Sequence, residues 1–143
     1  MIHLKNIHVV FNPGTPLEAT ALRGVDLKVA AGEFLTIIGS NGAGKSTSLN
    51  VIAGLITPSL GHVEVDGTDI TNWPIHQRAR LISRVFQDPK MGTCEDLTIL
   101  ENFALAYGRT APRGLRLAIS EDIREKTRAR LALLNLGIEK RLD

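Results

Sequence analysis

The chain has 143 residues, of which 43% are hydrophobic and 22% charged, and its formal net charge is +2 at pH 7. This length suffices for one domain with a sizeable core, and the small net charge gives no reason to expect a nucleic-acid partner. No apolar run is long enough to cross a bilayer, so we expect no membrane span of its own. The single cysteine, Cys94, has no partner for an internal disulfide, and the four histidines show no metal-ligand spacing.

Two segments of alternating apolar and polar residues open the chain and predict two strands with one wet face. The first covers residues 2–11 and ends at an Asn-Pro-Gly turn, and the second covers residues 22–29. The next run, residues 34–38, is short, apolar and partly β-branched, which predicts a fully buried strand. This order indicates an antiparallel layer attached to a parallel core.

Residues 39–47 read GSNGAGKST and fit the pattern G-x-x-x-x-G-K-[ST] at every fixed position. A helix is predicted to follow over residues 46–53, with Gly54 as its C-terminal stop. The order strand, glycine loop, helix is the context in which this pattern binds the phosphates of a nucleotide. A chance glycine turn before a helix is the alternative, and the complete match with correct flanks argues against it.

Each residue type in this loop suits a nucleotide polyphosphate with Mg²⁺. Glycine accepts the positive φ angles of a tightly curled chain, and we expect this at Gly39, Gly42 and Gly44. The helix that follows directs free amides and its positive dipole end at the anion. Lys45 suits the β- and γ-phosphates, and the Ser46 hydroxyl suits Mg²⁺. The predicted cofactor-binding residues of the loop are Gly39, Ser40, Asn41, Gly42, Ala43, Gly44, Lys45, Ser46 and Thr47.

The rest of the chain alternates between short strands and helices. A hairpin is predicted at Asp66-Gly67, a short helix from Pro74 through about Arg80, and another strand over residues 81–86. The arginines of this region are interpreted as a solvated face: Arg78, Arg80 and Arg84.

The remaining segment is predicted to be helical. A capping box at Thr98 and Glu101 predicts a helix through about Tyr107, and Ser120 precedes a second helix that runs to about Leu134. Residues 108–114 are predicted as a loop between them. We expect a nucleotide-binding core with an antiparallel layer over residues 1–89, and the beginning of a helical subdomain over residues 90–143.

Five features of the sequence belong together: Phe11, residues 22–47, VEVDGTD at 63–69, VFQDP at 85–89 and DLTILEN at 96–102. On these features the sequence resembles, from its first residue to its last, the ATP-binding subunit of an ATP-binding cassette (ABC) transporter. It implies an α/β fold: a P-loop NTPase core with an N-terminal antiparallel β layer, the start of a helical subdomain and an incomplete central sheet.

The family also implies roles for single residues. Phe11 corresponds to an aromatic residue that stacks on adenine, although a core residue at the end of a strand is the simpler alternative. Gln87 corresponds to the glutamine that contacts Mg²⁺ or the attacking water, although a polar residue is also ordinary where a strand ends. The expected catalytic residues are therefore Lys45 and Gln87, the expected metal ligands are Ser46 and Gln87, and the expected cofactors are ATP and Mg²⁺.

The resemblance further implies two partners, a transmembrane permease subunit and a second copy of the cassette. It implies a cytoplasmic location at the inner face of the cell membrane. Three motifs of the family are missing: the Ser-Gly-Gly signature, the apolar strand with its aspartate and catalytic glutamate, and the switch histidine. We therefore expect an N-terminal portion of a longer subunit that binds Mg·ATP and, alone, does not hydrolyse it.

Two other functions remain alternatives. One is a non-catalytic module, a fragment or degenerate cassette that binds ATP and docks on a partner. The other is a GTPase or small-molecule kinase, against which the missing Asn-Lys-x-Asp motif and the VFQDP element argue.

Overall fold

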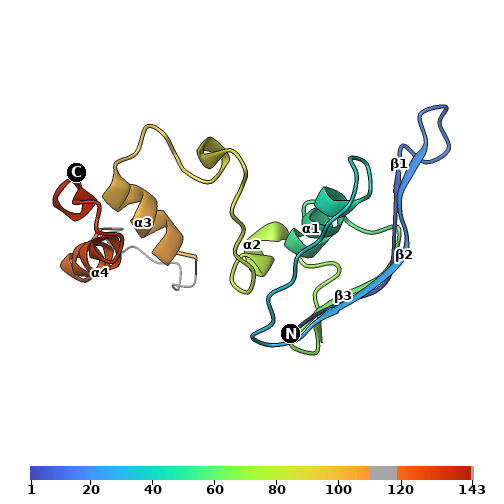
Figure 1. Ribbon diagram of the computed structural model, residues 1–143, viewed down its shortest axis with the longest axis horizontal. Helices are drawn as coiled ribbons and strands as arrows, with labels where there is room; N and C mark the ends of the chain where they lie inside the picture. Colours follow the sequence, from blue (N-terminus) through green and yellow to red (C-terminus); the bar gives the residue numbers. More distant parts are fainter. Residues whose placement is uncertain (110–118, 143) are drawn as a thin grey trace. The chain divides into compact units, whose positions relative to one another are not determined.

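The computed structural model describes residues 1–109 and 119–142. These residues form two compact units, Met1–Ser83 and Arg84–Asp143, and each is described by itself. The first unit is a small sheet with helix α1, and the second is a helical unit (Figure 1). Their composition is α/β, as predicted. The functional division at residues 89 and 90 remains a prediction.

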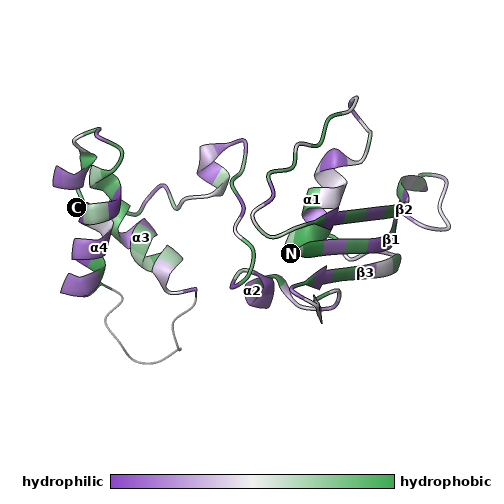
Figure 2. Cartoon of the chain, turned by 60° about the horizontal axis from the view of Figure 1, so that its bottom comes forward, coloured by the Kyte–Doolittle hydropathy of each residue, from purple (hydrophilic) through white to green (hydrophobic). Residues whose placement is uncertain are grey.

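The sheet of the first unit has four antiparallel strands in the order β2-β1-β3-β4. Strand β1 covers Ile2–Phe11, β2 covers Ala19–Val29, β3 covers Leu60–Val65 and β4 covers Thr68–Asp69. Leu4 pairs with Leu27 on one side and with Val63 on the other. Figure 2 shows the alternation of apolar and polar residues along these strands that predicted the antiparallel layer.

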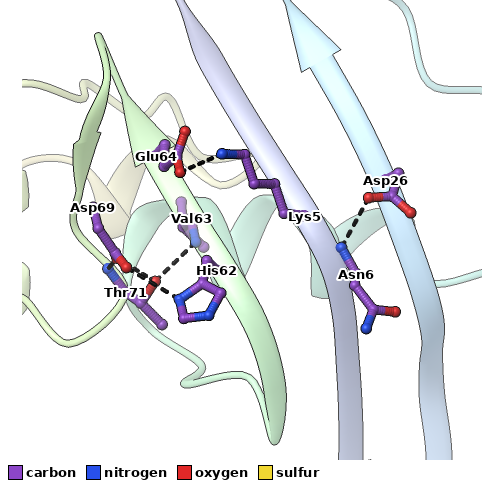
Figure 3. Close-up of polar contacts among 8 residues, drawn as sticks. All are labelled: Lys5, Asn6, Asp26, His62, Val63, Glu64, Asp69 and Thr71. Carbon is purple, nitrogen blue, oxygen red and sulfur yellow. Dashed lines mark hydrogen bonds and ion pairs between the residues drawn. The ribbon is translucent and has the colours of Figure 1, made fainter.

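Polar contacts tie the strands together at their solvated side (Figure 3). Lys5 pairs with Glu64 across β1 and β3, with 2.5 Å between Nζ and Oε1. Asn6 has a φ of 48° beside a break in the β1–β2 register, and its amide donates to Asp26 Oδ1 at 2.9 Å. This hydrogen bond satisfies a backbone donor where the ladder is interrupted.

The predicted hairpin joins β3 to β4. Asp66 and Gly67 have φ angles of 49° and 80°, as a two-residue type I′ turn requires. Just beyond it, the Thr71 amide donates to Asp69 Oδ1 at 2.8 Å, while the Thr71 hydroxyl accepts the Val63 amide at 2.8 Å (Figure 3). Thr71 thereby extends the pairing of the short β4 strand by means of its side chain.

Helix α1, Lys45–Ala53, confirms the predicted helix and packs on the sheet. Gly54 ends it in the left-handed conformation, with a φ of 82°. The core between helix and sheet consists of Leu4, Ile7, Val9, Leu22, Val51, Ile52, Val63, Val65 and Ile70. After the hairpin, the short helix α2 covers Ile75–Arg78 and follows Pro74 as predicted.

Two strand predictions were wrong. Residues 34–38 and 81–86 are not part of any strand, and Phe34, Ile38 and Val85 are 93%, 89% and 96% exposed. A strand needs a neighbour to receive its backbone hydrogen bonds, and the described residues supply none for either segment. The sheet that the described residues form is entirely antiparallel, and they form no part of the predicted parallel core.

The first element of the second unit is the short 3₁₀ helix η1, Pro89–Met91. It is followed by helices α3, Ile99–Tyr107, and α4, Glu121–Ala132, and by a second 3₁₀ helix, η2, Ile138–Lys140. The predicted capping box at the start of α3 is confirmed. Thr98 and Glu101 form the reciprocal capping box, with backbone-to-side-chain distances of 2.8 and 3.3 Å. Ser120 accepts the Ile123 amide at 3.3 Å.

Helix α4 ends two residues before the predicted position, Leu134. The helices pack around Leu100, Leu131 and Leu142. Most of the predicted loop at residues 108–114 lies outside the described residues. Within the described part of the chain, no helix has both the length and the apolar character needed to cross a membrane.

Candidate functional site

The loop before α1 is curled, as its glycines predicted. Gly42 and Gly44 have φ angles of 83° and 85°, which residues with a Cβ rarely adopt, and the Ala43 amide donates to the Ser40 carbonyl at 3.2 Å. Gly39 does not have a positive φ, so that expectation was wrong. A Cβ on Gly39 would instead lie 3.2 Å from the Cβ of Ala43, so glycine here permits close approach within the loop.

Strand β2 fixes the position of the loop's last glycine. Gly44 is buried, and a Cβ on it would lie 2.6 Å from Leu22 Cδ2 and 3.0 Å from the Ala21 carbonyl oxygen. The backbone of the loop therefore rests directly on the strand. Because Gly44 is also the N-cap of α1, this contact sets where the helix begins and where its first amides point.

The first turn of α1 offers unpaired donors. The amides of Lys45, Ser46 and Thr47 precede the first intrahelical hydrogen bond, which runs from the Ser48 amide to the Gly44 carbonyl at 2.8 Å. Residues 39–43 are exposed, so these donors face an open loop. Together with the dipole of α1, they make a site for an anion of phosphate size.

Lys45 lies across the same loop. Its ammonium donates to the carbonyl oxygens of Gly39 and Ser40 at 2.8 and 2.6 Å. Both acceptors are neutral, so the positive charge stays available to an anion in the loop. The sequence predicted that Lys45 would contact phosphate, and that role remains a prediction.

Phe11 ends β1 and is 40% exposed. It pairs with Ala19 of β2, three positions from Leu22, the residue on which Gly44 rests. At a strand rise of about 3.3 Å per residue, Ala19 and Leu22 are roughly 10 Å apart. An accessible aromatic ring thus lies on the same pair of strands that contacts Gly44, the last glycine of the phosphate loop at residues 39–47.

Gln87 belongs to the second unit, so the pairing of Gln87 with Ser46 as metal ligands remains a prediction. Gln87 is exposed and is followed by Asp88, whose side chain accepts the Lys90 amide at 3.0 Å at the start of η1. No group of three or more His, Cys, Asp or Glu side chains within the described residues is arranged to hold a metal ion. The oxygen ligands that Mg²⁺ prefers would here come from the Ser46 hydroxyl and from phosphate.

Arg78 corrects the interpretation of a solvated arginine face. Arg80 is exposed as predicted, and Arg84 is half-buried with its guanidinium 4.7 Å from the centre of the Phe86 ring. Arg78 is only 2% exposed and donates to backbone carbonyls of α1 and of the segment after β4. Burial lowers the pKa of its guanidinium, and the negative charge of Asp69 opposes part of that shift. No local pattern distinguishes Arg78 from Arg80, so this contact was missed.

Comparison with known proteins shows which family the sequence resembles. A family model described as ABC transporter matches residues 22–143. A tyrosine transport ATP-binding protein of Clostridioides difficile is 42% identical over all of this chain and 57% of its own length. The lipoprotein-releasing system ATP-binding protein LolD 1 of Caulobacter vibrioides is 34% identical over all of this chain and 58% of its own.

A solved structure of a dimeric ATP-binding cassette in a post-hydrolysis state, bound to ADP and Pi, has a TM-score of 0.77 at 29% identity. The match covers 96% of this chain and 58% of that one. The chain thus spans less than two thirds of the length of these relatives.

Proposed function

Because this chain belongs to the ABC transporter family, we propose that it binds Mg·ATP as part of the ATPase subunit that powers a transporter. The observation that carries the proposal is the phosphate loop. Its curled backbone, the free amides of the first turn of α1 and the ammonium of Lys45 converge on one exposed volume. A nucleotide polyphosphate has the size and charge that such a volume accepts.

Residues of the loop would divide the work of binding. The amides of Lys45, Ser46 and Thr47 would donate to phosphate oxygens, and the Lys45 ammonium would contact the β- and γ-phosphates as a mobile cation. The Ser46 hydroxyl would hold Mg²⁺, which supplies charge neutralisation at the phosphates when it is bound. Phe11 would stack on the base, which its exposure and its place on the sheet support.

Turnover requires more than this cradle. Phosphoryl transfer also needs a group that positions the attacking water, and Gln87 is the candidate that this chain offers. We propose that residues 1–143 alone bind Mg·ATP without steady hydrolysis. Phosphate release from purified 143-residue protein tests this directly: the expected rate equals that of the Lys45→Ala variant. A higher rate that Lys45→Ala abolishes would refute the proposal.

The partners follow from the family. We propose that the chain serves a transmembrane permease subunit and pairs with a second cassette, at the cytoplasmic face of the cell membrane. Support comes from transport functions in the names of its relatives and from the dimer in the similar solved structure. Co-purification of the chain with a permease, from membranes of cells that express both, would test this assignment.

One observation favours a second function, a non-catalytic module that binds nucleotide and docks on a partner. Phe34 and Ile38 are 93% and 89% exposed, and exposed apolar surface of this kind marks interaction sites. Reconstitution separates the two functions. ATP hydrolysis that appears when a permease is added supports the ATPase subunit, whereas nucleotide binding with no hydrolysis in that assembly supports the docking module.

A further inference from the structure

Arg78 makes a set of hydrogen bonds that nucleotide binding by the loop does not explain. Its Nη1 donates to the carbonyls of Val51 and Ile52 at 2.7 and 3.0 Å. Its Nη2 donates to the Thr71 carbonyl at 2.6 Å, and its Nε donates to the Trp73 carbonyl at 3.1 Å. A side chain that is only 2% exposed therefore links α1 to the segment that follows β4.

The helix end that Arg78 contacts lacks a cation of its own. The last carbonyls of a helix have no intrahelical partner and carry the negative end of its dipole. Helix α1 has no basic residue in its last turn. Arg78 supplies that charge from outside the helix, and Gly54 leaves room for it, since a Cβ on Gly54 would lie 2.8 Å from Arg78 Cδ.

The other end of this link is anchored to the sheet. Thr71, whose carbonyl accepts from Arg78, donates through its amide to Asp69 at 2.8 Å and accepts the Val63 amide of β3 at 2.8 Å. The polar chain therefore runs from β3 through Thr71 and Arg78 to the last turn of α1. Helix α1 is held to the sheet at two ends, by Gly44 on β2 and by Arg78.

We infer that Arg78 is a positioning residue for the phosphate loop, an inference that rests on the proposed function. Helix α1 has nine residues and is about 13 Å long, short enough to move as a rigid rod. The apolar packing of Val51 and Ile52 on the sheet is non-directional, so by itself it does not fix how the helix is rotated or shifted along the sheet. The directional hydrogen bonds of Arg78 fix the far end of the helix, so they hold the amides of Lys45 and Ser46 in the orientation that phosphate needs.

Calorimetric titration with Mg·ATP tests this, using Arg78→Lys, Arg78→Gln and the control Arg80→Gln. Each protein is measured below its own unfolding transition, with folding checked by circular dichroism. The expected result is an affinity about tenfold weaker or more for Arg78→Gln, partial rescue for Arg78→Lys, and no change for Arg80→Gln, because Arg80 is exposed. A purely stabilising role would lower only the unfolding midpoint, and wild-type affinity in folded Arg78→Gln would overturn the inference.

A second measurement uses the wild-type protein, so it does not depend on whether a variant folds. Because the Nε–H of Arg78 is held by the Trp73 carbonyl, its NMR signal can be followed as Mg·ATP is added to the 143-residue protein. If Arg78 and the loop are coupled, nucleotide must also act on Arg78, and slower exchange of this proton is expected. If Mg·ATP saturates the protein and the exchange rate of this proton does not change, the inference about Arg78 is overturned while the proposed function stands. If the protein binds no Mg·ATP, the proposed function fails and this inference fails with it.

Discussion

Gly44 packs directly on Leu22: a Cβ added to Gly44 would lie 2.6 Å from Leu22 Cδ2, closer than real Cβ contacts come. This one contact joins the antiparallel layer to the phosphate loop, because Gly44 is the N-cap of α1 and Leu22 belongs to β2. The antiparallel sheet therefore supports the phosphate loop and fixes its position.

The contact predicts different results for two glycines with nearly the same φ. Gly42→Ala places its Cβ in open space, so we expect it to cost about 1–2 kcal/mol, the penalty of the left-handed conformation. Gly44→Ala adds a collision with Leu22 and with the Ala21 carbonyl, so we expect a clearly larger loss and weaker Mg·ATP binding. Urea denaturation of both variants measures the difference. Equal stabilities of the two variants would contradict the direct packing of Gly44 on β2.

Local patterns predicted the parts of this molecule that local interactions build. The phosphate loop, α1, the Asp66-Gly67 hairpin and the capping box at Thr98 each depend on residues within a few positions of one another. Turn chemistry and helix caps can be identified at that range. The family resemblance was confirmed as well. It could be predicted because its motifs are also short stretches of sequence.

The remaining features could not be predicted from the sequence, because they depend on contacts between residues far apart in the chain. Residues 34–38 have the composition of a buried strand, but a strand also needs a hydrogen-bonding neighbour, and composition does not reveal whether one is present. Arg78 reaches the end of α1 and Arg80 does not. This difference depends on tertiary packing, which the local sequence does not reveal. Whether Gln87 meets Ser46, and whether Phe11 meets adenine, are likewise long-range questions that binding experiments can answer.

The capping box gives a prediction for the second unit. Thr98→Ala removes the acceptor for the Glu101 amide and should cost about 1 kcal/mol. Thr98→Ser keeps a hydroxyl and serves as the control, with an expected cost near zero. Hydrogen exchange of the α3 amides reports the change, and we expect roughly fivefold faster exchange for Thr98→Ala only. Equal exchange in the two variants would show that the box contributes nothing to α3.

Asp69 gives a prediction of pH dependence. Hydrogen bonds from the hydroxyl and amide of Thr71, with a smaller contribution from His62, lower the pKa of Asp69. A carboxylate whose folded pKa is lowered stabilises the protein above its unfolded pKa of about 3.9, and this contribution is lost as the pH falls through the folded pKa.

Asp69→Asn should therefore destabilise the protein at neutral pH, and the gap to wild type should close in acid, below about pH 3.9. Urea denaturation at several pH values measures this gap, with Asp96→Asn, an exposed loop carboxylate, as the control. If the difference in free energy of unfolding between wild type and Asp69→Asn stays constant from neutral to acidic pH, the ionised carboxylate of Asp69 does not contribute to stability through Thr71.

The measurement that tests the central claim most directly is a calorimetric titration of the 143-residue protein with Mg·ATP, alongside Lys45→Ala and the control Lys28→Ala. Lys28 is exposed on β2, so its loss should leave the affinity unchanged. Hydrogen bonds to charged groups contribute about 1.5–3 kcal/mol, so Lys45→Ala should weaken binding at least about tenfold. Binding of Mg·ATP that Lys45→Ala does not weaken would contradict a nucleotide site built on residues 39–47.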